Sequence, residues 1–204
     1  MKRFEIICGV VFLIALIFKI AFWPGGSILA TLSMTLLACF YFIFGFAFFN
    51  NIRLTNIFNN KSYQDISELR FIVPIGVGCG LSTLCIGILF KMMHFPGGSM
   101  VLHTGLLIIL IAAIIALVNF FRSKSEFYKT IFLRIIIIGG LGLFLAFPSS
   151  DIAITKILYR NHPDFIKAYE NYLKDTGNGE AHKQWRMEFD RMNTIQEKSE
   201  NQLK

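Results

Sequence analysis

Acidic residues are scarce in the first 150 residues of this 204-residue chain, which contain only Glu5, Asp65, Glu68 and Glu126. This scarcity removes the paired carboxylates that many hydrolases use as general acid and base. The sequence also lacks a Ser/His/Asp set, a phosphate-binding Walker loop and a dinucleotide-binding glycine motif. We therefore predict a protein that is not an enzyme, with no catalytic residues and no cofactor.

Cysteine is sparse as well, and Cys8, Cys39, Cys79 and Cys85 all fall inside apolar stretches without forming a CxxC pair. Cysteines in such surroundings behave as small apolar side chains, so we predict neither disulfides nor a zinc site. A cleaved signal peptide is not predicted, because the first apolar run continues to Trp23 without a small-residue cleavage site.

Long apolar runs are what the chain has instead. Hydrophobic residues make up 54% of it, charged residues only 16%, and the mean hydropathy is +0.57. A helix needs about 20 apolar residues to cross a bilayer. The runs predict an all-α, polytopic membrane protein with about five transmembrane helices, over residues 6–23, 28–49, 71–90, 100–121 and 131–147.

These helices predict five regions in order along the chain. The expected regions are a first transmembrane hairpin (1–50), a cytoplasmic loop (51–70), a second hairpin (71–122), a loop with the fifth helix (123–150) and an extramembrane helical tail (151–204). In the tail, apolar residues at helical spacing and a glycine break predict two amphipathic helices, the first beginning at Pro163.

The net charge of +7 indicates topology. The tail is neutral, with nine basic and nine acidic residues, whereas the eleven basic residues before it face four acids. Most of those eleven lie at the N-terminus, in residues 50–70 or in residues 122–134, which alternating spans place on one side. The positive-inside rule makes that side cytoplasmic. We therefore predict a multi-pass protein of the inner membrane, with a cytoplasmic N-terminus, a periplasmic tail and no nucleic-acid binding.

One ten-residue motif occurs twice. FKIAFWPGGS at residues 18–27 recurs 72 positions later as FKMMHFPGGS at residues 90–99. An apolar run precedes and follows each copy, so the motif predicts a duplicated helical hairpin with a tight, uncharged turn. The predicted turn residues are Trp23, Pro24, Gly25 and Gly26 in the first copy and Phe95, Pro96, Gly97 and Gly98 in the second.

Each motif places a lysine, Lys19 or Lys91, five residues before its proline. That is roughly 7–8 Å inside the end of the helix at 1.5 Å per residue. Such a lysine is either an anchor that reaches to the interface or a paired, functional charge. For the paired case, Asp151 is the nearest acid predicted on the same side. A lipid phosphate or an acid on another protein is the alternative partner.

Histidine and methionine gather around the second turn, where His94 and His103 accompany Met92, Met93 and Met100. Soft ligands of this kind suit copper(I), and copper handling is one candidate function. The equivalent positions of the first copy hold no metal-binding side chains, which favours packing roles and predicts no metal site.

The duplicated string resembles the N-terminal membrane hairpin of GldL, the inner-membrane component of the gliding-motility and type IX secretion motor. The similarity covers the two hairpins, about half of the chain, and is closer in residues 90–98. The resemblance implies tandem GldL-like hairpins in an envelope setting. The family carries a proton-coupled glutamate thirteen residues after the proline, where this chain has Leu37 and Ile109.

Three hypotheses for function follow. The first is a non-enzymatic scaffold or accessory component of an envelope or secretion assembly, bound to the lipid bilayer and to a secretion-system membrane protein, with oligomerisation left open. The second is a small transporter or channel that uses Lys19 and Lys91. The third is the copper-handling protein.

Overall fold

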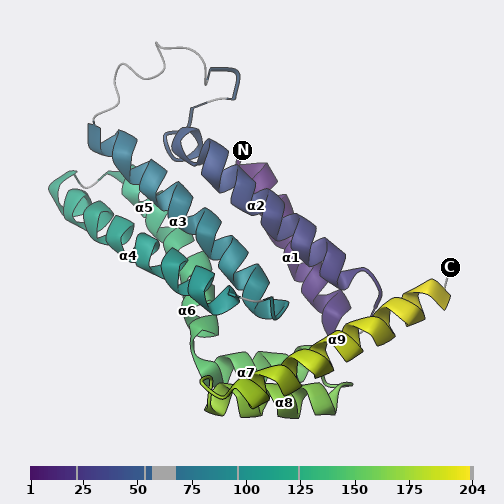
Figure 1. The fold of residues 1–204 in the computed structure, drawn as a ribbon. Coiled ribbons are helices and arrows are strands. Elements are labelled where there is room, and N and C mark those ends of the chain that lie inside the picture. Colours follow the sequence, from purple (N-terminus) through teal and green to yellow (C-terminus); the bar gives the residue numbers. More distant parts are fainter. Residues whose placement is uncertain (22, 53, 57–67, 96, 124, 203–204) are drawn as a thin grey trace.

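The computed structural model describes residues 1–21, 23–52, 54–56, 68–95, 97–123 and 125–202 (Figure 1). Every regular element in these ranges is helical, which confirms the predicted all-α class. The helices are α1 (Lys2–Ile20), α2 (Gly26–Phe49), the short 3-10 helix η1 (Leu54–Asn56), α3 (Glu68–Met92), α4 (Gly98–Ser123), α5 (Glu126–Arg134), η3 (Ile135–Gly139), α6 (Gly140–Ala146), α7 (Pro148–Leu158), α8 (Pro163–Lys174) and α9 (Gly179–Gln202).

The long helices run back and forth between two ends of a bundle (Figure 1). Both duplicated turns lie at one end, where α7, α8 and α9 lie across the helix ends; we call this the corner end. The N-terminus and the connection between α4 and α5 lie at the other end, the loop end. The assignment of the corner end to the periplasm stays a prediction.

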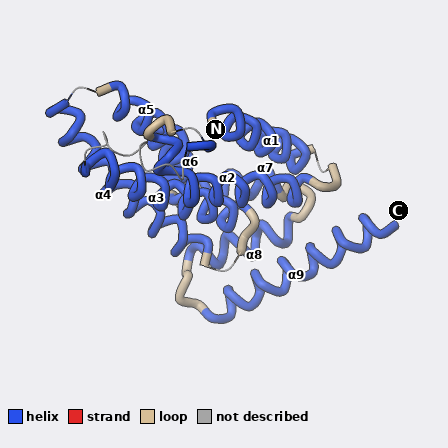
Figure 2. The backbone as a smooth tube through the Cα atoms, turned by 90° about the horizontal axis from the view of Figure 1, so that it is seen from above, coloured by secondary structure: helices blue, strands red, loops and turns tan. Residues whose placement is uncertain are grey.

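Helix α3 is the centre of the bundle, because it packs against α2, α4 and the helix formed by α5, η3 and α6 (Figures 1 and 2). The fifth predicted helix is interrupted in its middle by η3. This is a single π-helical stretch, in which hydrogen bonds span five residues instead of four. It begins directly after Arg134, the one charged residue in the predicted fifth span.

Within the described ranges, four helices are long and apolar enough to cross a membrane: residues 26–49, 70–92, 98–122 and 127–146. Apolar side chains such as Leu107 and Ile136 point outward from them, 58% and 69% exposed, as side chains facing lipid do. The 19-residue helix α1 is not among the four; it carries Lys2, Arg3, Glu5 and Lys19. The fifth crossing stays a prediction.

The described residues of the two corners share several features. In the second, the N–H of Phe95 donates to the carbonyl of Phe90 at 2.9 Å, and the N–H of His94 donates to the carbonyl of Lys91 at 3.3 Å. These are the two hydrogen bonds of a Schellman helix end, and the Phe90 and Phe95 rings supply its usual apolar contact, edge to face at 5.4 Å. His94 takes the left-handed conformation, φ 54°, that glycine commonly occupies there.

The first corner shares one of these hydrogen bonds and the aromatic contact. The N–H of Trp23 donates to the carbonyl of Phe18 at 2.9 Å, and the two rings meet edge to face at 5.1 Å. Gly25 and Gly97 share a positive φ, 86° and 80°, which an L side chain rarely adopts. The aromatic and glycine positions of the motif therefore specify a helix end.

The second glycine of each pair permits a close approach. A Cβ added at Gly26 would lie 2.9 Å from the backbone nitrogen of Lys19, and one at Gly98 would lie 3.0 Å from that of Lys91. Pro96 lies outside the described residues, as does most of the 51–70 loop. The corner geometry explains the repeated glycines and aromatics, but it makes no use of the lysine side chains.

The tail has three helices where two were predicted. α8 begins at Pro163 as expected, and α9 follows the glycine break, but α7 begins at Pro148, directly after the fifth long helix. The sequence analysis did not predict α7, because a proline followed by two serines is also typical of a turn. Proline fits the first turn of a helix because its missing N–H has no intrahelical partner there. The residues placed in α7 include Asp151.

We predict that Gly87→Ala weakens the α3–α4 contact. The added Cβ would lie 2.6 Å from the Cα of Leu102, a backbone atom that cannot turn aside. Overpacking of this kind costs about 1–3 kcal/mol, so the thermal midpoint in detergent should fall. Gly9→Ala is the matched control, because no atom lies within 4 Å of its Cβ position. Equal midpoints for the two variants would contradict the packing described here.

Candidate functional site

Lys91 forms an ion pair at the corner end. Its Nζ lies 3.0 Å from Oδ2 of Asp151, and the two side chains are 11% and 3% exposed. The same Nζ donates to Oγ of Ser99, 2.8 Å away in the first turn of α4. The expected pairing of a motif lysine with Asp151 is thus found for Lys91. Asp151 reaches it because α7 begins at Pro148 and brings its first turn against the corner.

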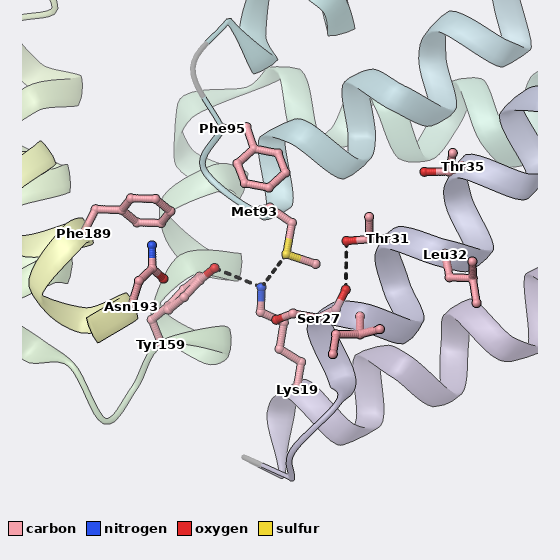
Figure 3. Close-up of a pocket in the computed structure, with 11 residues that line it drawn as sticks. Lys19, Ser27, Thr31, Leu32, Thr35, Met93, Phe95, Tyr159, Phe189 and Asn193 are labelled. Atoms are coloured by element: carbon pink, nitrogen blue, oxygen red, sulfur yellow. Dashed lines mark hydrogen bonds between the residues drawn. The ribbon is translucent and has the colours of Figure 1, made fainter. Parts of the chain in front are cut away.

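Lys19, the equivalent lysine, has different partners. Its Nζ donates to the hydroxyl of Tyr159 at 2.9 Å and to Sδ of Met93 at 3.1 Å (Figure 3). It also lies 3.5 Å from the carbonyl oxygen of Met92. Among the described residues, no carboxylate forms an ion pair with it. The two copies of the motif therefore hold one paired and one unpaired ammonium group.

His94 lies between the second corner and the tail, only 5% exposed. Its ring centroid lies 4.5 Å from that of Tyr169 and 5.2 Å from those of Tyr159 and Phe165. Burial, together with the charges of the two motif lysines, lowers the pKa of His94 to about 3. The imidazole is therefore neutral at physiological pH.

A short polar chain joins His94 to the ion pair. Nε2 of His94 lies 3.4 Å from Oγ1 of Thr155, whose hydroxyl donates to the backbone carbonyl of Asp151 at 2.8 Å. The hydroxyl of Tyr169 donates to Oδ2 of Asp151 at 2.7 Å. Burial and the Asp151 carboxylate raise the pKa of Tyr169, so it remains a donor. The contact between His94 and Thr155 joins α7 to the second corner, and the hydrogen bond from Tyr169 to Asp151 joins α8 to α7.

The structure does not assemble the histidines and methionines into a metal site. His94 is buried under the tail, whereas His103 is exposed on α4 with its Nδ1 2.6 Å from the carbonyl oxygen of Ser99. Met100 is 77% exposed, and Sδ of Met93 is engaged by a lysine. In the part of the chain that the structure describes, no group of three or more His, Cys, Asp or Glu side chains could hold a metal ion.

A second, partly buried ion pair lies toward the loop end, and the sequence analysis did not identify it. Arg134 donates from Nε and Nη2 to the two carboxylate oxygens of Glu5, both at 2.7 Å. The hydroxyl of Tyr41 donates to the same carboxylate at 2.5 Å, and the guanidinium lies over the ring of Phe48. Glu5 directly precedes the first predicted span, and Arg134 lies near the start of the fifth. Their similar depth in the membrane was the one feature of the sequence that could have indicated the pair.

Two cavities flank the corner-end contacts. One of about 590 Å³ is lined by Lys19 and by residues of α2, the second corner and α9 (Figure 3). The other, about 310 Å³, lies between the second corner and the α8–α9 pair and is lined by Lys91 and His94. The arrangement can bind ligands and hold the tail in place.

Comparisons with protein-family models, with curated proteins and with solved structures find no match to this chain.

We predict that Lys91→Met destabilises the protein more than Lys19→Met. Removing Lys91 leaves the Asp151 carboxylate buried without its cation, which typically costs about 3–5 kcal/mol. Removing Lys19 loses hydrogen bonds from a charged donor, but its partners are neutral, so no buried charge is left without a counter-ion. Thermal unfolding in detergent measures both. Adding Asp151→Asn to Lys91→Met should recover part of the loss, and equal effects of the two single changes would show that the ion pair is not decisive.

We also predict that His94 makes stability depend on pH. The unfolded chain gains a proton near pH 6.5 but the folded chain only near pH 3, so the unfolded state binds more protons between these values. Stability from this group is therefore fully present above pH 6.5 and falls as the pH drops, by roughly 3 kcal/mol at about pH 4. Asparagine tolerates the left-handed conformation, so His94→Asn is the test variant. Its thermal midpoint should fall less steeply than that of the wild type as the pH is lowered. His103→Asn should retain the wild-type slope.

Proposed function

We propose that this chain is a multi-pass protein of the inner membrane that holds a folded periplasmic platform on tandem GldL-like hairpins. It acts as a scaffold or accessory component of an envelope or secretion assembly, and it is not an enzyme. The GldL resemblance suggests the cellular setting, and the four apolar helices support the membrane location.

The observation that carries the proposal is the fastening of the tail to both corners. Lys91 holds Asp151, and Lys19 holds Tyr159. Around His94, the rings of α7, α8 and α9 close into one aromatic cluster. The contacts keep the tail folded on the bundle, and Figure 1 shows the second half of α9 running out beyond the long helices. A fixed, projecting helix is suited to bind a partner protein.

The outward face of α1 supports a fifth crossing. Ile6, Leu13 and Ile17 are each about 60% exposed, on a helix that packs beside α2. Lys19 at its end is satisfied by the second corner and α7, and Glu5 at its start by Arg134. With its inner charges paired or hydrogen-bonded, α1 can cross the bilayer despite its composition.

Proton-driven motor activity is not part of the proposal. Leu37 and Ile109, at the positions of the family's glutamate, are 7% and 4% exposed and cannot carry a proton. A transporter remains the second candidate, favoured by the cavity beside Lys19. In that case Lys19→Met combined with Lys91→Met should abolish flux in proteoliposomes in which the protein is still folded.

The topology and the scaffold role are tested together. Reporter fusions at residues 60 and 126 should be active in the cytoplasm, and one at residue 204 in the periplasm. In native gels of mild-detergent extracts the chain should migrate in a complex. Met187→Glu, at a 62% exposed apolar position on α9, should remove it from that complex without changing its thermal midpoint.

Thr194→Glu, an exposed position seven residues further along α9, is the control for added charge and should leave the complex intact. Migration of the wild-type chain as a lone monomer would contradict the scaffold role. Reporters placing residues 60 and 126 on opposite sides would contradict the topology.

A further inference from the structure

The two motif lysines occupy equivalent positions but differ in their anions. Lys91 has the carboxylate of Asp151 at 3.0 Å and the hydroxyl of Ser99 at 2.8 Å. Ser27 is the residue equivalent to Ser99 in the first copy, and it lines the 590 Å³ cavity together with Lys19. The first copy thus keeps the ammonium and the serine, and a cavity takes the place of the carboxylate.

Among the described residues that line the cavity around Lys19 none is acidic, and the ammonium is the only formal charge (Figure 3). Nζ of Lys19 is held toward the cavity by the hydroxyl of Tyr159 and the sulfur of Met93. These partners are neutral. A partly buried cation with only neutral partners creates a site that favours one negative charge.

The α2 side of the cavity is amphipathic along its length. Ser27, Thr31 and Thr35 recur at four-residue spacing and form a hydroxyl row, with Ile28 and Leu32 beside them. From Ser27 to Thr35 this wall runs roughly 12 Å along the helix at 1.5 Å per residue.

All five residues of this wall are exposed on a helix apolar enough to span a membrane. The cavity is therefore open on the side of α2 and extends from the corner end into the apolar zone. A ligand with a charged head and an apolar chain fits both parts.

We propose that this cavity binds an anionic phospholipid, with the lipid phosphate paired to Lys19 in the role that Asp151 has for Lys91. Ser27 donates to the phosphate, and one acyl chain lies against Ile28 and Leu32. Phe95 and Phe189 cover the cavity from the second corner and from α9. The bound lipid joins the first hairpin to the tail. The proposal requires a membrane-embedded chain but not the scaffold role, so the partner-binding experiment can fail while this one succeeds.

Native mass spectrometry of the full chain with added phosphatidylglycerol or phosphatidylcholine tests the proposal. The wild type should retain one phosphatidylglycerol at least tenfold more tightly than phosphatidylcholine. Lys19→Met should remove this preference, and Lys19→Arg should keep it. Arg122→Met, which removes an exposed positive charge at the loop end of α4, is the control for non-specific attraction and should bind as the wild type does.

Leu32→Trp tests the chain-binding part while leaving Lys19 in place. It should weaken phosphatidylglycerol binding at least tenfold, and it keeps the proposal testable if Lys19→Met fails to fold. Inorganic phosphate at millimolar concentration should not displace the lipid. Equal retention by wild type and Lys19→Met, equal retention of the two lipids, unchanged binding by Leu32→Trp, or displacement by inorganic phosphate would overturn the proposal.

Discussion

The contact between Lys91 and Asp151 is the constraint on which the corner end depends. It joins the end of α3 to the first turn of α7, two segments 60 residues apart, and both charges are almost fully buried. Because an unpaired charge at this depth is costly, each group requires the other in place. The hydroxyls of Ser99 and Tyr169 complete the contact, so α4 and α8 are positioned by the same pair.

The repeated motif forms two corners with shared backbone features, and the differences described between them lie in the side chains. Both corners share the aromatic contact, the left-handed glycine and the close approach of the second glycine to the helix before it. The lysines diverge, since one faces a carboxylate and the other an open cavity. The tail thus makes different contacts with two similar hairpin ends, an ion pair at Lys91 and a neutral hydrogen bond partner at Lys19.

The sequence was sufficient to predict features that depend on a local residue pattern or on the scarcity of acidic residues. The apolar runs predicted the long helices, and the repeated Pro-Gly-Gly predicted the turns. Asp151 was identifiable as a partner because the first four predicted spans and both turns contain no carboxylate, which left it as the nearest acid on the same side. The Glu5–Arg134 pair was missed because its two residues are 129 positions apart, at the edges of their apolar runs.

Other features had no local signature. The α7 helix was hidden by Pro148, which fits both a turn and a helix start. His94 was considered as a ligand, but its position is a helix end that accepts a left-handed residue, and its surroundings come from tail helices about 60–100 residues away. Burial of this kind depends on tertiary packing, which periodicity does not encode.

The π-helical stretch η3 sets the rotational phase between the two ends of the fifth helix. Each residue of an α-helix advances about 100° around the axis. A π turn contains one extra residue, so the side chains that follow it are rotated relative to those of a regular α-helix. Arg134 before η3 therefore faces α1, while Gly142 after it faces Leu84 of α3. The wide turn lets a single helix form an ion pair near one end and a close packing contact further on. It also fixes the direction in which the helix ends, just before α7 begins.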